Sequence, residues 1–114
     1  MLDFACKKFK IEEVVVCSLG IRKIDFSILS IMYQTNTEMT VFDIAKKAGV
    51  DRTTAQKSIK KLLEKGLIQR YQENLKSGGY LFLYRSKDKE MIKNKIEATI
   101  NDWQKKVVLE LKKW

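Results

Sequence analysis

The sequence predicts a mainly α-helical protein with one small β-hairpin and a long C-terminal helix. Three observations lead to this fold class. Apolar residues recur at helical spacing through most of the chain. Two runs rich in Ile, Leu, Tyr and Phe, 67–74 and 80–86, flank a glycine-containing turn, and neither glycine nor proline interrupts residues 87–114. With 114 residues, we expect one domain with one hydrophobic core at 1–86, followed by a helix at 87–114.

The first third of the chain contains two predicted helices. Residues 1–11 alternate loosely between apolar and polar, which fits either an extended arm or a packed N-terminal segment. A short apolar helix is expected at 12–19, ended by Gly20, because glycine suits the left-handed conformation after a helix end. A second helix at about 22–35 is apolar around most of its circumference, so we expect it in the centre of the core.

Two shorter helices follow in the middle of the chain. Thr40 and Asp43 have the spacing of a capping box, which predicts that a helix begins at 41 and runs to 48. Asp51 is placed to cap the next helix, 51–65. The apolar stripe of that second helix consists of Ala55, Ile59, Leu62 and Leu63.

The order of these elements is that of a winged helix-turn-helix domain. Gly49 and Val50 form a tight turn between helices 41–48 and 51–65, and a hairpin at 67–86 follows at once. In this arrangement the second helix enters the major groove of double-stranded DNA and the hairpin is the wing. We therefore predict a sequence-specific, DNA-binding transcriptional regulator with 51–65 as its recognition helix.

The charge distribution agrees with a DNA partner. The net charge is +9, and residues 41–86 alone carry ten basic and four acidic side chains. Lys and Arg attract phosphates, Gln pairs with adenine, and Thr contacts phosphate or the thymine methyl group. We expect the basic hairpin residues on the same side as the outer face of the recognition helix, although its lysines alone could simply be a solvated face. The candidate DNA contacts are Arg52, Thr53, Thr54, Gln56, Lys57, Lys60, Lys61, Arg70, Lys76 and Arg85.

The C-terminal helix has an apolar seam close to a coiled-coil repeat. At 1.5 Å per residue this helix is about 40 Å long, longer than so small a core can cover. The same helix of a second chain is the simplest partner, and the resulting homodimer would present two recognition helices about 34 Å apart to a palindromic site. The alternative is a helix that folds back onto its own domain. The predicted dimer interface consists of Ile92, Ile96, Ile100, Trp103, Val107, Leu111 and Trp114.

Several function classes are disfavoured. The chain has no histidine, phosphate-binding loop or paired acid and base, so we expect no enzyme, no metal site and no cofactor. Cys6 and Cys17 lack the C-x-x-C spacing of zinc or redox sites, and Cys17 follows three valines, which suggests a small buried apolar residue. No stretch is long and apolar enough to span a membrane, and a cytoplasmic location is expected.

Two other functions are compatible with the same elements. A winged helix can serve as a protein–protein interaction module, with the C-terminal seam bound to another subunit. A sequence-independent chromatin or single-strand binder could instead stack bases on hairpin aromatics, which are equally suited to core and cross-strand pairs. These aromatics are Tyr71, Tyr80, Phe82 and Tyr84.

Three segments of the sequence resemble archaeal MarR/TrmB-like winged-helix regulators: 14–20 (VVVCSLG), 51–62 (DRTTAQKSIKKL) and 78–80 (GGY). The resemblance spans nearly the whole chain. It implies a dimeric transcription factor whose terminal helices form the dimer, and it gives the start of helix 51–65 the role of contacting DNA. Arg22 departs from the family pattern, in which a serine usually caps the second helix. The separate sugar-binding domain of full-length TrmB proteins does not follow, so the sequence identifies no small-molecule effector.

Overall fold

The computed structural model describes residues 1–114, which divide into two compact units. One unit comprises residues 21–88, and the other combines residues 1–20 with 89–114. The predicted division at residues 86 and 87 kept the N-terminal segment with the winged helix. The structure instead groups that segment with the last helix, because the helix Ile11–Leu19 packs against the helix Lys89–Lys113.

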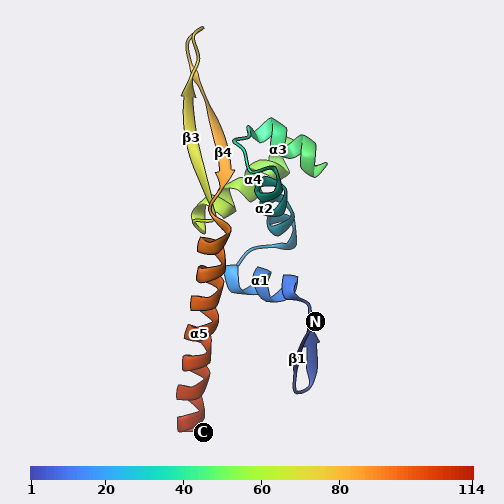
Figure 1. The fold of residues 1–114 in the computed structure, drawn as a ribbon, viewed down its shortest axis with the longest axis vertical. Coiled ribbons are helices and arrows are strands. Elements are labelled where there is room, and N and C mark those ends of the chain that lie inside the picture. Colours follow the sequence, from blue (N-terminus) through green and yellow to red (C-terminus); the bar gives the residue numbers. More distant parts are fainter. The chain divides into compact units, whose positions relative to one another are not determined.

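Residues 21–88 form three helices and a two-stranded hairpin (Figure 1). These elements are α2 (Lys23–Thr35), α3 (Val41–Ala48), α4 (Arg52–Glu64), β3 (Ile68–Asn74) and β4 (Tyr80–Ser86). Their order and their bounds agree with the sequence prediction to within one residue. The predicted fold class, mainly α-helical with a small β-hairpin, is confirmed.

Local capping explains where the helices of this unit begin. The Asp43 N–H donates to Thr40 Oγ1 at 3.1 Å and the Thr40 N–H donates to Asp43 Oδ2 at 3.1 Å, so a complete capping box opens α3. At α2 the carboxylate of Asp25 accepts from the Arg22 N–H at 2.9 Å. The acidic residue three positions into the helix thus caps its start even though Arg22 stands at the usual serine position.

The core of residues 21–88 is built around α2, as predicted. Ile28 and Met32 of this helix are completely buried, and they are joined by Ile44 of α3, Leu62 of α4 and Leu67. Gly49 ends α3 in the left-handed conformation, with φ +68°, which turns the chain sharply into α4. The Val50 N–H donates to the Ala45 carbonyl at 3.1 Å and closes that turn.

The hairpin is fixed to the helices at its base. Met39, in the loop after α2, exchanges two backbone hydrogen bonds with Tyr84 of β4, at 2.9 and 2.8 Å, and both side chains are buried. The Lys87 N–H donates to the Leu67 carbonyl at 3.0 Å and ties the two ends of the hairpin together. The far end of the hairpin, residues 75–79, is a turn in which Gly78 and Gly79 have positive φ. The wing is therefore anchored at one end and exposed at the other.

The second unit contains a short hairpin and two helices (Figure 1). Its elements are β1 (Leu2–Phe4), β2 (Lys7–Phe9), α1 (Ile11–Leu19) and α5 (Lys89–Lys113). Residues 1–11, which the sequence left open between an extended arm and a packed segment, contain the antiparallel β1–β2 hairpin. None of the helices of the chain combines the length with the apolar character that a membrane crossing requires.

The expectation that Cys17 is buried is wrong for this chain, because its thiol is exposed. The buried residue of α1 is Leu19, and Cys17 lies two residues before it. Two residues correspond to about 200° around a helix, so the side that buries Leu19 directs Cys17 outward.

Candidate nucleic-acid interface

The exposed face of α4 is polar, and it is cationic over residues 52–60, whereas the exposed Glu64 ends the helix. Arg52, Gln56 and Lys60 follow one another at intervals of four residues, and Thr53 and Lys57 lie beside them. All five side chains are exposed. The predicted outer face of the recognition helix therefore exists as one continuous surface that presents three cations, an amide and a hydroxyl.

Two other predicted contacts on α4 lie at the edges of this surface. Lys61 is half-buried, and so is Thr54. Thr54 helps to start the helix, since its N–H donates to Asp51 Oδ1 at 2.7 Å. Hydrogen bonding by the Thr54 side chain and backbone lowers the pKa of Asp51, with a smaller effect of the Lys57 charge. The Thr54 backbone thus completes the cap that Asp51 was predicted to form.

The opposite face of α4 contacts α2 through a buried polar pair. Asp25 of α2 and Ser58 of α4 are both completely buried. The Asp25 carboxylate also accepts from Arg22 Nε at 3.1 Å and from a terminal guanidinium nitrogen at 2.9 Å. Burial raises the pKa of Asp25, but the hydrogen bonds from Arg22 and the nearby Ser58 hydroxyl more than offset it and hold the pKa below its ordinary value. Asp25 and Ser58 are joined by no hydrogen bond of standard geometry.

Arg70 and Arg85 of the wing leave the hairpin on opposite faces, contrary to the expectation that they share one side. The register pairs Arg70 with Tyr84 and Gln69 with Arg85, and successive residues of a strand alternate between faces. A guanidinium terminal nitrogen of Arg85 donates to Asn36 Oδ1 at 3.2 Å, which holds this side chain against the loop after α2.

Arg70 is positioned by an aromatic neighbour on the adjacent strand. Its guanidinium carbon lies 4.4 Å from the centroid of the Phe82 ring. The Tyr80 ring follows, 5.2 Å from Phe82 between centroids. The sequence suggested for Phe82 only a role in stacking or packing. The signal that could have found its role is the hairpin register, because Phe82 is diagonal to Arg70 on the same face.

The wing aromatics do not form a platform for stacking bases. Tyr84 is buried, Phe82 is covered by Arg70, and the Tyr71 hydroxyl donates to Gln69 Oε1 on the other face of the hairpin. Tyr80 is 57% exposed and stands near the tip. Lys76 is exposed in the turn, so the charge at the tip of the wing is positive.

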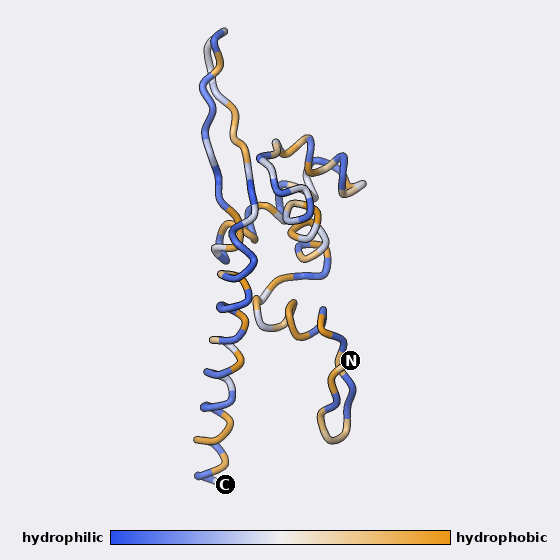
Figure 2. Tube along the Cα trace, viewed as in Figure 1, coloured by the Kyte–Doolittle hydropathy of each residue, from blue (hydrophilic) through white to orange (hydrophobic).

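The seam of α5 is covered only at its start. Ile92 and Ile96 are half-buried, and every α5 residue after Ile96 is exposed. Trp103 is 61% exposed and Trp114 is 100% exposed. Figure 2 shows hydrophobic positions recurring along most of this helix, while its very end is hydrophilic. The seven predicted interface residues thus separate into Ile92 and Ile96, which are half-buried within the chain, and the remaining five, which are exposed.

No group of three or more cysteine, aspartate or glutamate side chains lies close enough together to hold a metal ion. Cys6 and Cys17 are both exposed free thiols.

Comparison with known families decides the class of the protein. The family model described as "Sugar-specific transcriptional regulator TrmB" matches residues 16–90, well over half of the chain. This chain belongs to the TrmB family. Because that family consists of transcriptional regulators, the prediction that the chain is not an enzyme is confirmed on this ground.

Relatives and solved structures agree with this assignment. An uncharacterised protein of Methanocaldococcus jannaschii, MJ1082, is 34% identical over 108 residues, which are 95% of this chain and 85% of the relative. A possible transcriptional regulator from Methanosarcina mazei Go1 is 36% identical, with a TM-score of 0.93 over 100% of this chain and 96% of that one. The resemblance to archaeal MarR/TrmB-like regulators is confirmed.

A more distant structure shares the fold alone. A mutant of MepR from S. aureus, bound to an oligodeoxyribonucleotide, is 17% identical, with a TM-score of 0.59 over 86% of this chain and 72% of that one. The winged-helix architecture of this chain therefore occurs in a protein that was solved together with DNA.

Proposed function

We propose that this protein regulates transcription as a homodimer that binds double-stranded DNA sequence-specifically, with α4 in the major groove and the β3–β4 hairpin as the wing. The observation that supports the proposal most strongly is the continuous exposed surface of Arg52, Thr53, Gln56, Lys57 and Lys60. A major groove admits one α-helix, and its base edges are contacted by the residue types found here. Such a regulator would act in the cytoplasm.

The side chains of this surface would have different tasks. Lys57 and Lys60 would neutralise phosphates, which provides affinity without sequence information. Gln56 has the amide that pairs with adenine, and Arg52 can pair with guanine at the start of the helix. Thr53, Thr54 and Lys61 would add contacts at the edges. The proposed specificity thus depends chiefly on Arg52 and Gln56.

The wing would contact the DNA backbone beside the major groove. Phe82 restrains the Arg70 guanidinium while leaving its donors exposed, which lowers the entropy cost of a phosphate contact. Lys76 at the tip could reach the backbone further along the duplex. Arg85 is engaged by Asn36, so it would reach a phosphate only if that contact is exchanged.

The exposed half of the α5 seam supports the homodimer. A single chain leaves Ile100, Trp103, Val107, Leu111 and Trp114 in contact with water. Exposed apolar surfaces of this kind usually mark interaction sites. Two copies paired through α5 would cover these residues and would carry two recognition helices for a palindromic site.

The test is a double substitution on α4, Lys57→Ala with Lys60→Ala. Each dimer loses four cations, so the slope of log affinity against log salt should fall in magnitude by up to about 3–4, and the affinity should fall with it. The matched control, Lys105→Ala with Lys112→Ala, removes the same charge from α5 away from the seam and should leave the slope unchanged. Equal slopes for all three proteins would exclude α4 as the DNA-contacting element.

A further inference from the structure

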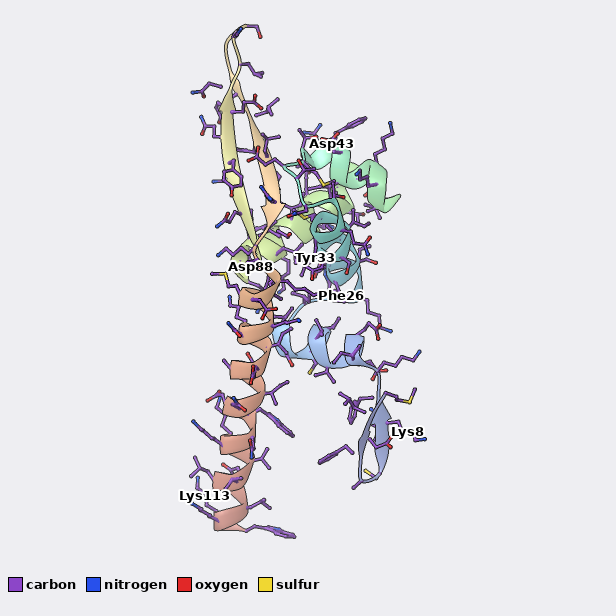
Figure 3. The ribbon with its side chains drawn as sticks, in the orientation of Figure 1. Lys8, Phe26, Tyr33, Asp43, Asp88 and Lys113 are labelled. Carbon is purple, nitrogen blue, oxygen red and sulfur yellow. The ribbon has the colours of Figure 1, made fainter.

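The β1–β2 hairpin has an apolar face with no cover in the single chain. The register pairs Leu2 with Phe9 and Phe4 with Lys7, so Leu2, Phe4 and Phe9 share one face, while Asp3 and Lys8 share the other. Leu2 is 49% exposed and Phe4 is 64% exposed. Figure 3 marks Lys8, which identifies the hairpin by its polar face.

A hairpin of this size needs packing to persist. Each strand has three residues, and an isolated two-stranded hairpin is marginally stable at best in water. Within the hairpin, the Lys7 ammonium lies 5.1 Å from the centroid of the half-buried Phe9 ring. Leu2 pairs with Phe9 across the hairpin and Phe4 stands opposite Lys7, yet the Leu2 and Phe4 side chains remain exposed.

The same unit has a second apolar surface without cover, at the end of α5. Ile100 is 41% exposed and Leu111 is 56% exposed, in addition to the two tryptophans. The hairpin and this end of α5 both belong to the unit of residues 1–20 and 89–114, yet both are exposed. One chain therefore does not cover either surface with the other.

Two-fold symmetry allows a second copy to cover both. In a symmetric dimer every contact between two different segments is made twice. A hairpin placed on the partner's α5 would cover two hairpin faces and two helix ends together. Pairing of the two helices alone would leave both hairpin faces in water. The family model begins at residue 16 and stops at residue 90, so neither surface belongs to the matched family segment.

We propose that the β1–β2 hairpin of each protomer packs its Leu2, Phe4 and Phe9 face onto the exposed apolar end of α5 of the other protomer. The hairpins then hold the dimer together from both sides. The proposal deepens the proposed homodimer and rests on it, and it gives residues 1–9 a role that is separate from DNA contact.

The first experiment measures dimer dissociation by sedimentation. The variant Leu2→Ser with Phe4→Ser changes the apolar face, and the control Asp3→Ser with Lys8→Ser changes the polar face of the same hairpin. Because all four side chains are exposed in the single chain, the fold of the monomer should survive, which circular dichroism can verify. The first variant should weaken the dimer by about tenfold or more. The control should stay within about twofold of the unmodified protein.

The second experiment identifies the surface that receives the hairpin. In a Leu111→Ser background, adding Leu2→Ser with Phe4→Ser should change dimer dissociation by no more than about twofold, because one partner of the contact is already missing. A full tenfold effect in that background would place the hairpin elsewhere and overturn the proposal. A dimer unaffected by the hairpin variant would also overturn it while leaving the homodimer intact. A protein that is monomeric at every concentration would refute the homodimer itself.

Discussion

The two units of this chain differ in how they obtain their stability. Residues 21–88 bury a core of apolar side chains from three helices and the base of the wing. In residues 1–20 and 89–114, Leu19 is the one buried side chain, and α5 has none. The first unit has the core of an independent domain, whereas the second exposes the surfaces through which a second molecule can stabilise it. The structure thus separates a unit with a buried core from a unit whose apolar side chains are mostly exposed, and the proposed function assigns DNA contact to the first and association to the second.

The two units should differ most in how much an Ile→Ala substitution lowers the free energy of unfolding. Ile28→Ala in α2 removes a completely buried side chain and should lower the free energy of unfolding by about 2–5 kcal/mol at every protein concentration. The Ile100 side chain of α5 is 41% exposed. At protein concentrations below the dimer dissociation constant, Ile100→Ala should therefore change the free energy of unfolding by no more than about 0.5 kcal/mol. Chemical denaturation at two concentrations measures both. Equal losses would contradict the division of the chain into a core unit and an association unit.

The next prediction concerns dimer formation through α5 and does not alter the core of residues 21–88. Val107→Lys introduces a charge into the proposed seam and should raise the dimer dissociation constant by about 100-fold or more, which corresponds to about 2.7 kcal/mol. Asn101→Lys adds the same charge on the other side of α5 and serves as the control. Sedimentation of both proteins over a range of concentrations gives the answer. Equal dimer dissociation constants for the two variants would show that the seam does not form the interface.

A smaller effect tests the ion pair of Asp25 with Arg22 at the start of α2. Asp25→Asn removes the charge that accepts from Arg22 and should cost about 1–3 kcal/mol at pH 7. The lower end is expected, because the Arg22 side chain is 55% exposed and water screens the pair.

The pH dependence of that loss follows from the direction of the pKa. The pKa of Asp25 in the folded chain lies below its unfolded value, so the carboxylate stabilises the fold above about pH 4, and the contribution is lost as the pH falls through the folded pKa. The difference between the unmodified protein and Asp25→Asn should therefore shrink below pH 4. Denaturation curves at pH 7 and at pH 3 measure it. A difference that is the same at both pH values would mean that the charge of Asp25 does not stabilise the fold.

The smallest effect concerns the turn between α3 and α4. Gly49 has φ +68°, and an added Cβ would meet nothing within 4 Å. Gly49→Ala should therefore cost only backbone strain, about 1 kcal/mol, and Gly49→Asn should cost less because asparagine tolerates the left-handed conformation. Thermal unfolding of the two variants compares them. A larger loss for Asn than for Ala would show that strain is not the cause.

The sequence predicted the first unit almost completely because local signals determine it. The capping residues Thr40, Asp43 and Asp51, the glycine turn and the helical period of α2 act within a few residues of one another. The same local logic failed at Cys17, because three preceding valines suggested burial while the helical period directed the thiol outward. It also failed for Arg70 and Arg85, whose opposite faces follow from a register that pairs residues across the hairpin.

The residues that position the candidate site depend on contacts distant in sequence. Asn36 meets Arg85 across 49 positions, and the buried Asp25 and Ser58 belong to different helices. The amphipathic patterns of α2 and α4 indicate which faces are buried, but not which polar residues meet there. The β1–β2 hairpin was left open because its strands are only three residues long and none of its apolar side chains is buried, so their pattern indicates no core.

In the proposed complex, the cationic face of α4 of each protomer contacts one specific DNA site. The affinity of the purified protein for a set of genomic DNA fragments, measured at several salt concentrations, tests this binding. One or a few fragments should bind far more tightly than the rest, with a log–log salt slope of about −5 to −9 for 6–10 neutralised phosphates. Equal binding to every fragment, or no binding at low salt, would contradict it.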